Sequence, residues 1–208
     1  MSKASDARRN ALYEIILNEG RVRVGDLARA LDVTTETIRK DLKVLEDRGV
    51  LIKKHGSATV RNAYYQLPFD VKLQENTLQK QWIARKALDF IQDDSIVYLD
   101  PGSTCLQLAK LLRLKKNITV LTNSLPIGDI ICDSGLELIM AGGKLQKKGR
   151  AFIGYYTTNV IDSIRIDIAF LGCDGFQDMD GPMTFSMEHA EINRHILRQS
   201  RKSILLCD

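Results

Sequence analysis

The segment from Thr34 to Arg48 is patterned as a helix with one apolar and one polar face. Ile38, Leu42 and Leu45 recur at intervals of four and three residues, so their side chains share one side of a helix. Thr34 is a suitable N-cap, because its hydroxyl can accept a hydrogen bond from a free backbone N–H of the first helical turn. We expect this helix to pack on its apolar side. Its opposite side consists of Thr35, Glu36, Arg39, Lys40 and Lys43.

Two shorter helices are expected before this one. Residues 6–18 and 25–31 have apolar positions at helical spacing, and Gly20 follows the first of them, where a left-handed residue often ends a helix. Only residues 32 and 33 separate the second and third helices, which is the connection of a helix-turn-helix. Residues 50–60 then have β-prone residues on both sides of a basic tip. This order of elements predicts a winged helix-turn-helix.

The surplus of positive charge lies entirely in the first 61 residues. These contain 13 Lys and Arg against 9 Asp and Glu, whereas residues 62–208 contain 17 of each. A basic module on a neutral body is typical of a protein whose small domain meets a polyanion. We therefore predict that residues 1–61 bind double-stranded DNA.

Two sets of residues are expected to make the DNA contacts. Short hydroxyls and a guanidinium at the start of a recognition helix suit base edges in the major groove. This first set consists of Thr34, Thr35, Glu36, Thr37 and Arg39. Basic side chains further along the helix and in the wing suit the phosphates. This second set consists of Lys40, Lys43, Lys53, Lys54 and His55.

Two other interpretations of this charged helix stay open. Charged helix faces are usually no more than solvated surface, and a helical module of this size also serves to contact other proteins. The first ignores the succession of three helices and a basic hairpin. The second leaves the basic wing unexplained.

The stretch from Val22 to Ala58 resembles the winged helix of DeoR-type repressors. The resemblance is specific because several short motifs follow one another in a fixed order. They are Asp26-Leu27-Ala28, Thr37-Ile38-Arg39-Lys40-Asp41-Leu42, Leu45-Glu46, Gly49 and His55-Gly56. This resemblance implies a transcriptional repressor whose DNA-binding domain comprises residues 1–61.

Residues 62–208 form the second predicted domain, after a polar linker over 61–67. A long helix is expected over 69–91, followed by strands that alternate with helices. The expected strands cover 95–99, 118–121, 136–141, 166–172 and 203–207, and the expected helices cover 106–112, 126–132, 157–164 and 188–200. This alternation predicts an α/β fold with a mostly parallel sheet covered on both faces.

Polar residues and glycines gather where the predicted strands end. Open α/β sheets bind ligands at the carboxyl ends of their strands, and small residues at a helix start offer N–H groups and hydroxyls to a phosphate. Any one of these loops alone is explained by the needs of a turn. The candidate effector-binding residues in these loops are Asp100, Gly102, Ser103, Thr104, Thr122, Asn123, Gly142, Gly143, Asp174 and Gly175.

The second domain also resembles the effector domain of the DeoR family. The matching pieces include Phe69, Asp100-Pro101-Gly102-Ser103-Thr104, Gly142-Gly143, and Ala169-Phe170-Leu171-Gly172 before Asp174. The resemblance implies a fold similar to ribose-5-phosphate isomerase and an effector that is a phosphorylated sugar or polyol. It adds Lys72, Lys80 and Asp208 to the candidate effector-binding residues. In the family the chain continues beyond Asp208, so we expect either a C-terminally truncated effector domain or one that lacks part of the family's sheet.

These features predict a homo-oligomeric repressor of a carbohydrate operon that a phosphorylated sugar or polyol controls. The alternative is an isomerase-like enzyme that carries a helix-turn-helix module, with Asp100, Asp174 and Glu188 as acid and base groups. The four cysteines, which lie far apart in the sequence, give no metal-ligand pattern. We therefore expect reduced thiols, no metal and no cofactor. Since the chain shows neither a membrane span nor a secretion signal, we expect a cytoplasmic protein without membrane partners.

Overall fold

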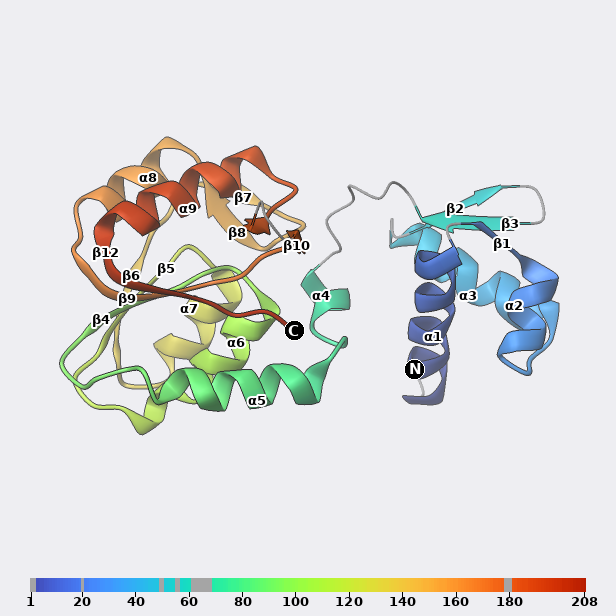
Figure 1. Cartoon of the computed structure of the whole chain (residues 1–208), viewed down its shortest axis with the longest axis horizontal. Helices are drawn as coiled ribbons and strands as arrows, with labels where there is room; N and C mark the ends of the chain where they lie inside the picture. Colours follow the sequence, from blue (N-terminus) through green and yellow to red (C-terminus); the bar gives the residue numbers. More distant parts are fainter. Residues whose placement is uncertain (1–2, 20, 49–50, 55–56, 61–68, 178–180) are drawn as a thin grey trace. The chain divides into compact units, whose positions relative to one another are not determined.

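A computed structural model describes residues 3–19, 21–48, 51–54, 57–60, 69–177 and 181–208 (Figure 1). The chain divides into two compact units, residues 1–68 and residues 69–208. Each unit is described by itself. The sequence placed the boundary between residues 61 and 62, and residues 61–68 lie outside the described part.

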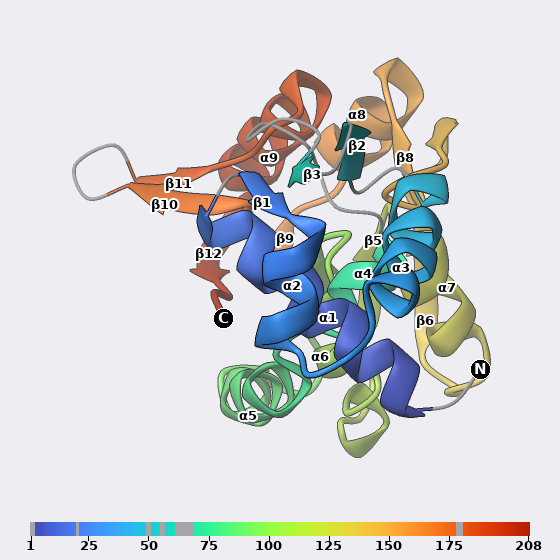
Figure 2. The same cartoon turned by 90° about the vertical axis from the view of Figure 1, so that its right-hand side faces the viewer.

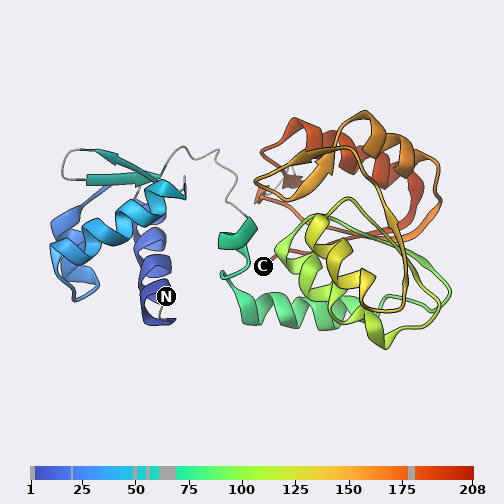
Figure 3. The same ribbon diagram turned by 180° about the vertical axis from the view of Figure 1, so that it is seen from behind.

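The first unit contains three helices and a three-stranded antiparallel sheet, seen from opposite sides in Figures 1 and 3. The helices are α1 (Lys3–Glu19), α2 (Val24–Ala30) and α3 (Thr35–Asp47). The strands are β1 (Arg21–Arg23), β2 (Leu51–Lys54) and β3 (Ser57–Val60), with β3 in the middle. These elements confirm the predicted winged helix-turn-helix.

The core of the first unit explains how α3 is oriented. Leu12 and Ile16 of α1, Leu27 of α2, and Ile38 and Leu42 of α3 are almost completely buried. The apolar side of α3 therefore packs inward, as its residue spacing predicts. The helix begins where expected, because the Thr34 hydroxyl accepts a hydrogen bond from the backbone N–H of Thr37 at 3.2 Å.

A five-stranded, fully parallel sheet is the centre of the second unit. Its strands lie in the order β12-β9-β4-β5-β6. Their bounds are β4 (Ile96–Leu99), β5 (Thr119–Thr122), β6 (Glu137–Met140), β9 (Ile166–Leu171) and β12 (Ser200–Leu205). The sheet confirms the predicted α/β class.

Helices cover both faces of this sheet, as Figure 1 shows. Val97 and Leu99 of β4 face the core under α5 (Thr77–Leu88), α6 (Ser103–Ala109) and α7 (Leu125–Cys132). Tyr98 faces the opposite core, under α8 (Tyr155–Asp162) and α9 (Met187–Gln199). A short 3-10 helix (Leu112–Leu114) follows α6. Because successive strand residues point to opposite faces, both sides of each central strand are apolar.

Two parts of the second unit differ from the sequence expectation. The single helix expected over residues 69–91 is wrong, because a turn at residues 73–76 separates α4 (Phe69–Lys72) from α5. Asn76 in this turn has a left-handed φ of 47°, which no continuous helix accommodates.

Two hairpins were also not expected. They are β7 (Lys144–Gln146) with β8 (Ala151–Ile153), and β10 (Gly175–Gln177) with β11 (Gly181–Met183). Figure 2 shows β10 and β11 side by side. Among the helices that the structure describes, none is both long and apolar enough to cross a membrane.

Candidate functional site

The outward face of α3 carries most of the residues that the sequence assigned to DNA. Arg39, Lys40 and Lys43 are exposed, and so are Thr34, Thr35 and Glu36 before them. Thr37 is half-buried, and its hydroxyl oxygen lies 2.9 Å from that of Thr34. The nearest oxygen of Glu36 lies 3.8 Å from Nη1 of Arg39, and both side chains are more than half exposed. An ion pair this exposed to solvent is weak, so the Arg39 guanidinium stays available to another acceptor.

A buried ion cluster fixes α3 against α1. Asp41 is 2% exposed, and its two carboxylate oxygens accept hydrogen bonds from Nε of Arg8 at 2.6 Å and Nε of Arg9 at 2.8 Å. A buried carboxylate without such partners would be strongly destabilising. Sequence reasoning treated Asp41 as part of a motif and did not predict this contact. It adds to the burial of Ile38, Leu42 and Leu45 in holding α3 with its polar side outward.

The wing is described only in part. Lys53 and Lys54 belong to β2, where they pair in register with Ala58 and Ser57 of β3. His55 lies outside the described residues. The structure thus shows the two-stranded wing but does not describe the three basic side chains that were expected to contact phosphates.

The carboxyl edge of the parallel sheet has a switch point between β4 and β9. From β4 the chain proceeds to β5 and β6 on one side, and then returns to the other side of β4 for β9 and β12. Open α/β sheets bind ligands at such a switch point. Asp100 follows β4, and one of its carboxylate oxygens accepts a hydrogen bond from the backbone N–H of Gly172, after β9, at 3.0 Å.

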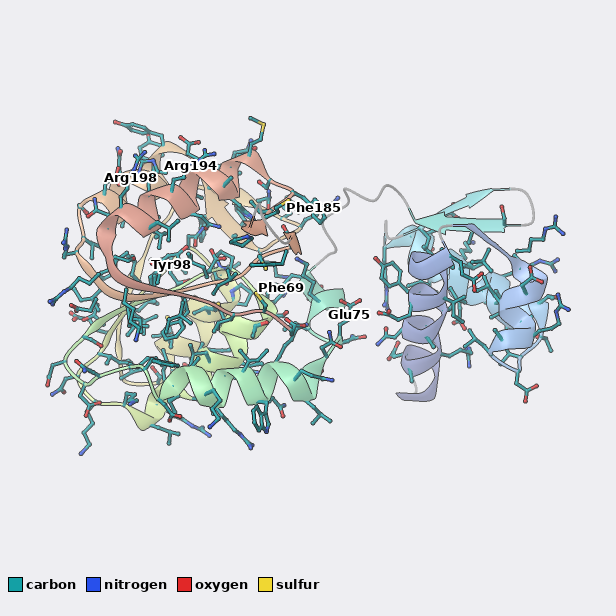
Figure 4. The ribbon with its side chains drawn as sticks, viewed as in Figure 1. Phe69, Glu75, Tyr98, Phe185, Arg194 and Arg198 are labelled. Atoms are coloured by element: carbon teal, nitrogen blue, oxygen red, sulfur yellow. The ribbon has the colours of Figure 1, made fainter. Side chains whose placement is uncertain are left out.

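Asp100 is part of a small buried network. The Tyr98 hydroxyl lies 2.8 Å from the side-chain oxygen of Asn123 and 3.3 Å from Asp100. Burial raises the pKa of the Asp100 carboxyl, and the nearby charge of Asp174 adds to this rise. Asp100 therefore differs from an ordinary surface carboxylate. In Figure 4 Tyr98 lies within the sheet, while Phe69 and Phe185 lie toward its carboxyl edge.

Asp174 forms a second, strongly ionic contact at the same edge. Its carboxylate lies 2.5 Å from Nζ of Lys72 and accepts further hydrogen bonds from the Thr184 hydroxyl at 2.9 Å and the Phe185 amide at 3.1 Å. Burial alone would raise its pKa, but the attraction of Lys72 and these hydrogen bonds outweigh burial and lower it. Lys72, with 27% of its side chain exposed, is the accessible cation of this pair.

Lys80 is buried, and its ammonium group is fully engaged. Nζ donates to the backbone oxygens of Lys72 at 2.7 Å and Glu75 at 2.8 Å, and lies 3.3 Å from the Asp208 carboxylate. Asp208 also accepts from the Thr104 hydroxyl at 2.9 Å. The structure thus brings Lys80, Thr104 and Asp208 together, in contacts that tie the α4–α5 turn to the sheet.

The other predicted residues occupy structural positions around this edge. Thr122 and Asn123 are buried and bond to the carbonyl oxygens of Leu99 at 2.7 Å and Phe152 at 2.8 Å. Gly102 stands immediately before α6, Ser103 is its buried first residue, and Gly175 begins β10. Gly142 and Gly143 follow β6, where the carbonyl of Gly142 accepts from the Thr157 hydroxyl at 2.9 Å.

Three further polar residues gather between the β7–β8 hairpin and α9. In the described part of the chain, the buried side-chain atoms without a hydrogen-bond partner are Oε1 of Gln146, Nε2 of His189 and Oδ1 of Asn193. A Cβ on Gly149 would lie 2.9 Å from Gln146 Oε1 and 3.8 Å from His189 Cε1, so these two side chains approach the same space. His189 also acts electrostatically on Asp100. The sequence did not point to Gln146 because its hairpin was not predicted, and no motif marks His189 and Asn193 on the predicted helix.

Family comparison agrees with both units. A model described as the DeoR-like helix-turn-helix domain matches residues 8–63, and a model described as the DeoR C terminal sensor domain matches residues 75–208. This chain belongs to the DeoR family. Together the two matches account for nearly the whole chain.

Several DeoR-family relatives are similar along almost the whole chain. The L-fucose operon activator of Escherichia coli is 31% identical over 97% of this chain and 84% of its own length. The lactose phosphotransferase system repressor of Staphylococcus epidermidis is 30% identical over 97% and 81%. The glycerol-3-phosphate regulon repressor of Escherichia coli is 27% identical over 97% and 80%.

Solved structures give a more distant likeness. Ribose 5-phosphate isomerase A from Methanocaldococcus jannaschii is 14% identical, with a TM-score of 0.46 over 63% of this chain and 52% of that chain. The fold of the second unit is therefore established by its own parallel sheet and by the family match.

Proposed function

We propose that this DeoR-family protein is a homo-oligomeric repressor of a carbohydrate-utilisation operon, released from its operator by a phosphorylated sugar or polyol. The observation that carries the DNA-binding part is the orientation of α3. Ile38, Leu42 and Leu45 are buried, whereas Arg39 and Lys40 on the opposite side are exposed. A helix presented in this way, after a tight turn, fits the major groove with its first residues at the base edges.

The names of the relatives support the carbohydrate part of this proposal. Those compared above act on an L-fucose operon, a lactose phosphotransferase system and a glycerol-3-phosphate regulon. Two of these three proteins are repressors and one is an activator. We therefore propose that this protein represses its operon. Whether the effector weakens or strengthens DNA binding is measured in the test below.

The polar groups at the carboxyl edge of the sheet support a ligand with hydroxyls and a phosphate. Asp100 accepts hydrogen bonds at the end of β4, and Lys72 supplies a partly exposed cation beside Asp174. Oε1 of Gln146, Nε2 of His189 and Oδ1 of Asn193 are, in the described part of the chain, buried atoms without a hydrogen-bond partner. Unpaired buried polar atoms are costly, so a polyhydroxyl ligand that pairs with them gains affinity and selectivity.

Release from DNA requires that the ligand distinguish between two arrangements of the protein. Two recognition helices reach successive major grooves only when an oligomer holds them about 34–36 Å apart. We propose that the effector binds more tightly to an arrangement in which this spacing is lost. Only such a difference in affinity shifts the balance between the two forms.

The contacts of the carboxylates favour binding over catalysis. Asp174 is held by Lys72 and Thr184, and Glu188 is exposed and bonds to the Ser186 hydroxyl at 2.9 Å. Hydrogen bonds from its own backbone amide and from Ser186 lower the pKa of Glu188, which makes it a weaker base. We therefore propose that these groups position a ligand.

Retention of the chain's own upstream DNA tests this function. The full chain is titrated onto that fragment at fixed salt, alone and with a panel of sugar and polyol phosphates, with each unphosphorylated sugar as the matched control. We expect tighter binding than to random DNA, and loss of retention with one phosphorylated compound only. Retention that never exceeds that of random DNA at matched salt would refute the proposal.

A further inference from the structure

Cys173 and Cys207 meet at the carboxyl ends of two neighbouring strands. Their Sγ atoms are 3.4 Å apart, although 34 positions separate them in the sequence. Parallel pairing places Leu205 of β12 opposite Leu171 of β9, and the amide of Leu206 still donates to the Leu171 carbonyl at 2.8 Å. Two residues beyond this last pair, Cys207 is level with Cys173.

This position suits a disulfide. Neighbouring strands lie about 4.7–4.9 Å apart, which falls within the Cα separation of roughly 4.4–6.8 Å that disulfides span. Bond formation then requires the two sulfur atoms to approach to about 2 Å, a movement within reach of side-chain rotation. The two cysteines are far apart in the sequence and meet only because β9 pairs with β12, so sequence spacing does not predict this pair.

We propose that Cys173 and Cys207 form a reversible intrachain disulfide, made by exchange with a small-molecule disulfide of the glutathione type. The described residues contain no group of three or more His, Cys, Asp or Glu side chains that could hold a metal ion, so these thiols have no metal-ligand cluster around them. The site lies beyond the function proposed above and depends on neither DNA nor effector.

The order of the exchange follows from the exposure of the two thiols. Cys207 is exposed, whereas Cys173 is partly covered, and burial together with the Cys207 contact raises the pKa of Cys173 to about 11. Cys207 therefore reacts first, because thiol exchange proceeds through the thiolate. Its thiolate attacks one sulfur of oxidised glutathione, which forms a mixed disulfide and releases one glutathione as a thiolate.

Cys173 completes the reaction. After losing its proton to the released thiolate or to solvent, it attacks the Cys207 sulfur and displaces the second glutathione. Two protein thiols are oxidised, one small disulfide is reduced to two thiols, and each leaving thiolate takes up one of the two protons lost by the protein. An excess of reduced glutathione reverses both steps.

The bond would join two loops that carry candidate effector residues. Cys173 directly precedes Asp174, which pairs with Lys72, and Cys207 directly precedes Asp208, which pairs with Lys80. Oxidation thus ties the loop after β9 to the end of β12. It restrains the two loops without removing either ion pair.

Peptide mapping of the full chain tests this proposal. The protein is equilibrated with oxidised glutathione, its remaining thiols are alkylated, and it is digested with trypsin. Trypsin separates all four cysteines, because Arg165 and Arg194 flank the Cys173 peptide and Lys202 precedes Cys207. With alkylation under denaturing conditions we expect one linked pair of peptides, from Cys173 and Cys207, which dithiothreitol separates. The buried Cys105 should be alkylated, and the exposed Cys132 should carry either the alkyl group or glutathione.

Two variants and a second readout make the result decisive. Cys173→Ser should leave Cys207 as a stable mixed disulfide with glutathione, whereas Cys132→Ser, which removes the exposed thiol of α7, should leave the linked pair intact. Hydrogen exchange over residues 181–186 should slow on oxidation of the wild-type chain but not of Cys173→Ser. Alkylation of both Cys173 and Cys207, a mixed disulfide that persists at Cys207 of the wild-type chain, or unchanged exchange would each overturn the proposal.

Discussion

Thr157 occupies the space that a side chain on Gly143 would need. A Cβ on Gly143 would lie 2.6 Å from the Thr157 hydroxyl oxygen and 2.8 Å from the carbonyl oxygen of Ile153, and Gly143 has a φ of +153°. Gly142, next to it, has nothing within 4 Å of its own Cβ position. Two adjacent glycines that the sequence grouped together thus have different structural roles.

Gly143→Ala should destabilise the second unit by roughly 1–3 kcal/mol, because the added carbon meets backbone and the φ is unfavourable for alanine. Gly142→Ala is the matched control and should change stability by less than about 0.5 kcal/mol. Calorimetric unfolding of the full-length variants measures both. Equal losses at the two positions would show that the packing against Thr157 is not the cause.

The contact between Asp41 and the two arginines should dominate the stability of the first unit. Asp41→Asn removes the buried carboxylate that Arg8 and Arg9 share, and we expect a loss of roughly 3 kcal/mol. Hydrogen exchange of the α3 amides in the full chain measures this local loss. Asp47→Asn changes an exposed carboxylate on the same helix and should leave exchange unaltered. Similar exchange in both variants would contradict the structural role of Asp41.

Asp100 should make the second unit less stable as the pH rises. Because burial raises its pKa in the folded state above the ordinary 3.8, the unfolded chain loses this proton at a lower pH than the folded protein does. The charged carboxylate therefore lowers the stability of the folded protein above its folded-state pKa, and has no such effect below pH 3.8. An amide resembles the protonated acid, so Asp100→Asn should raise the melting temperature at neutral pH, by an amount that shrinks in acid.

Asp174 should show the opposite dependence. Its pKa is lowered in the folded state, so its stabilising effect is present above 3.8 and disappears as the pH falls through the folded-state pKa. Asp174→Asn should therefore lower the melting temperature at neutral pH, and the loss should vanish in acid. Calorimetry across this pH range measures both variants. Shifts of the same sign for Asp100→Asn and Asp174→Asn would contradict the two assigned environments.

Lys72 should couple stability to effector binding through Asp174. Lys72→Met leaves a mostly buried carboxylate without its cation, and we expect a loss of roughly 2–3 kcal/mol. Adding Asp174→Asn removes the unpaired charge and should restore much of that stability. The double variant still lacks Lys72, so the phosphorylated effector should not release it from DNA even though its stability is restored. A double variant that still responds would remove Lys72 from the effector site.

The sequence predicts those elements whose residues repeat with a clear period. The apolar spacing of Ile38, Leu42 and Leu45 was sufficient to predict α3 and its outward face. The alternation of buried strands and helices likewise predicted the parallel sheet. The hairpins β7–β8 and β10–β11 were not predicted, because strands of three residues are too short to show a period of two.

Contacts between distant residues could not be predicted in this way. The pairing of Asp41 with Arg9 spans 32 positions, and that of Lys72 with Asp174 spans 102. The meeting of Cys173 and Cys207 depends on strand order, which periodicity does not encode. Sequence patterns therefore locate the loops of the candidate site, while the tertiary fold decides which of their side chains pair with one another.

The most direct test of the account compares two DNA fragments, the chain's own upstream region and a random sequence of equal length, over a range of salt concentrations. Arg39→Ala should weaken binding to the upstream fragment by roughly 1–3 kcal/mol and bring it closer to that of the random fragment. Lys40→Ala should weaken both and reduce the salt slope by about one. Lys116→Ala, an exposed lysine of the second unit, is the control and should change neither. Equal affinity of the wild-type chain for the two fragments at every salt concentration would contradict the account.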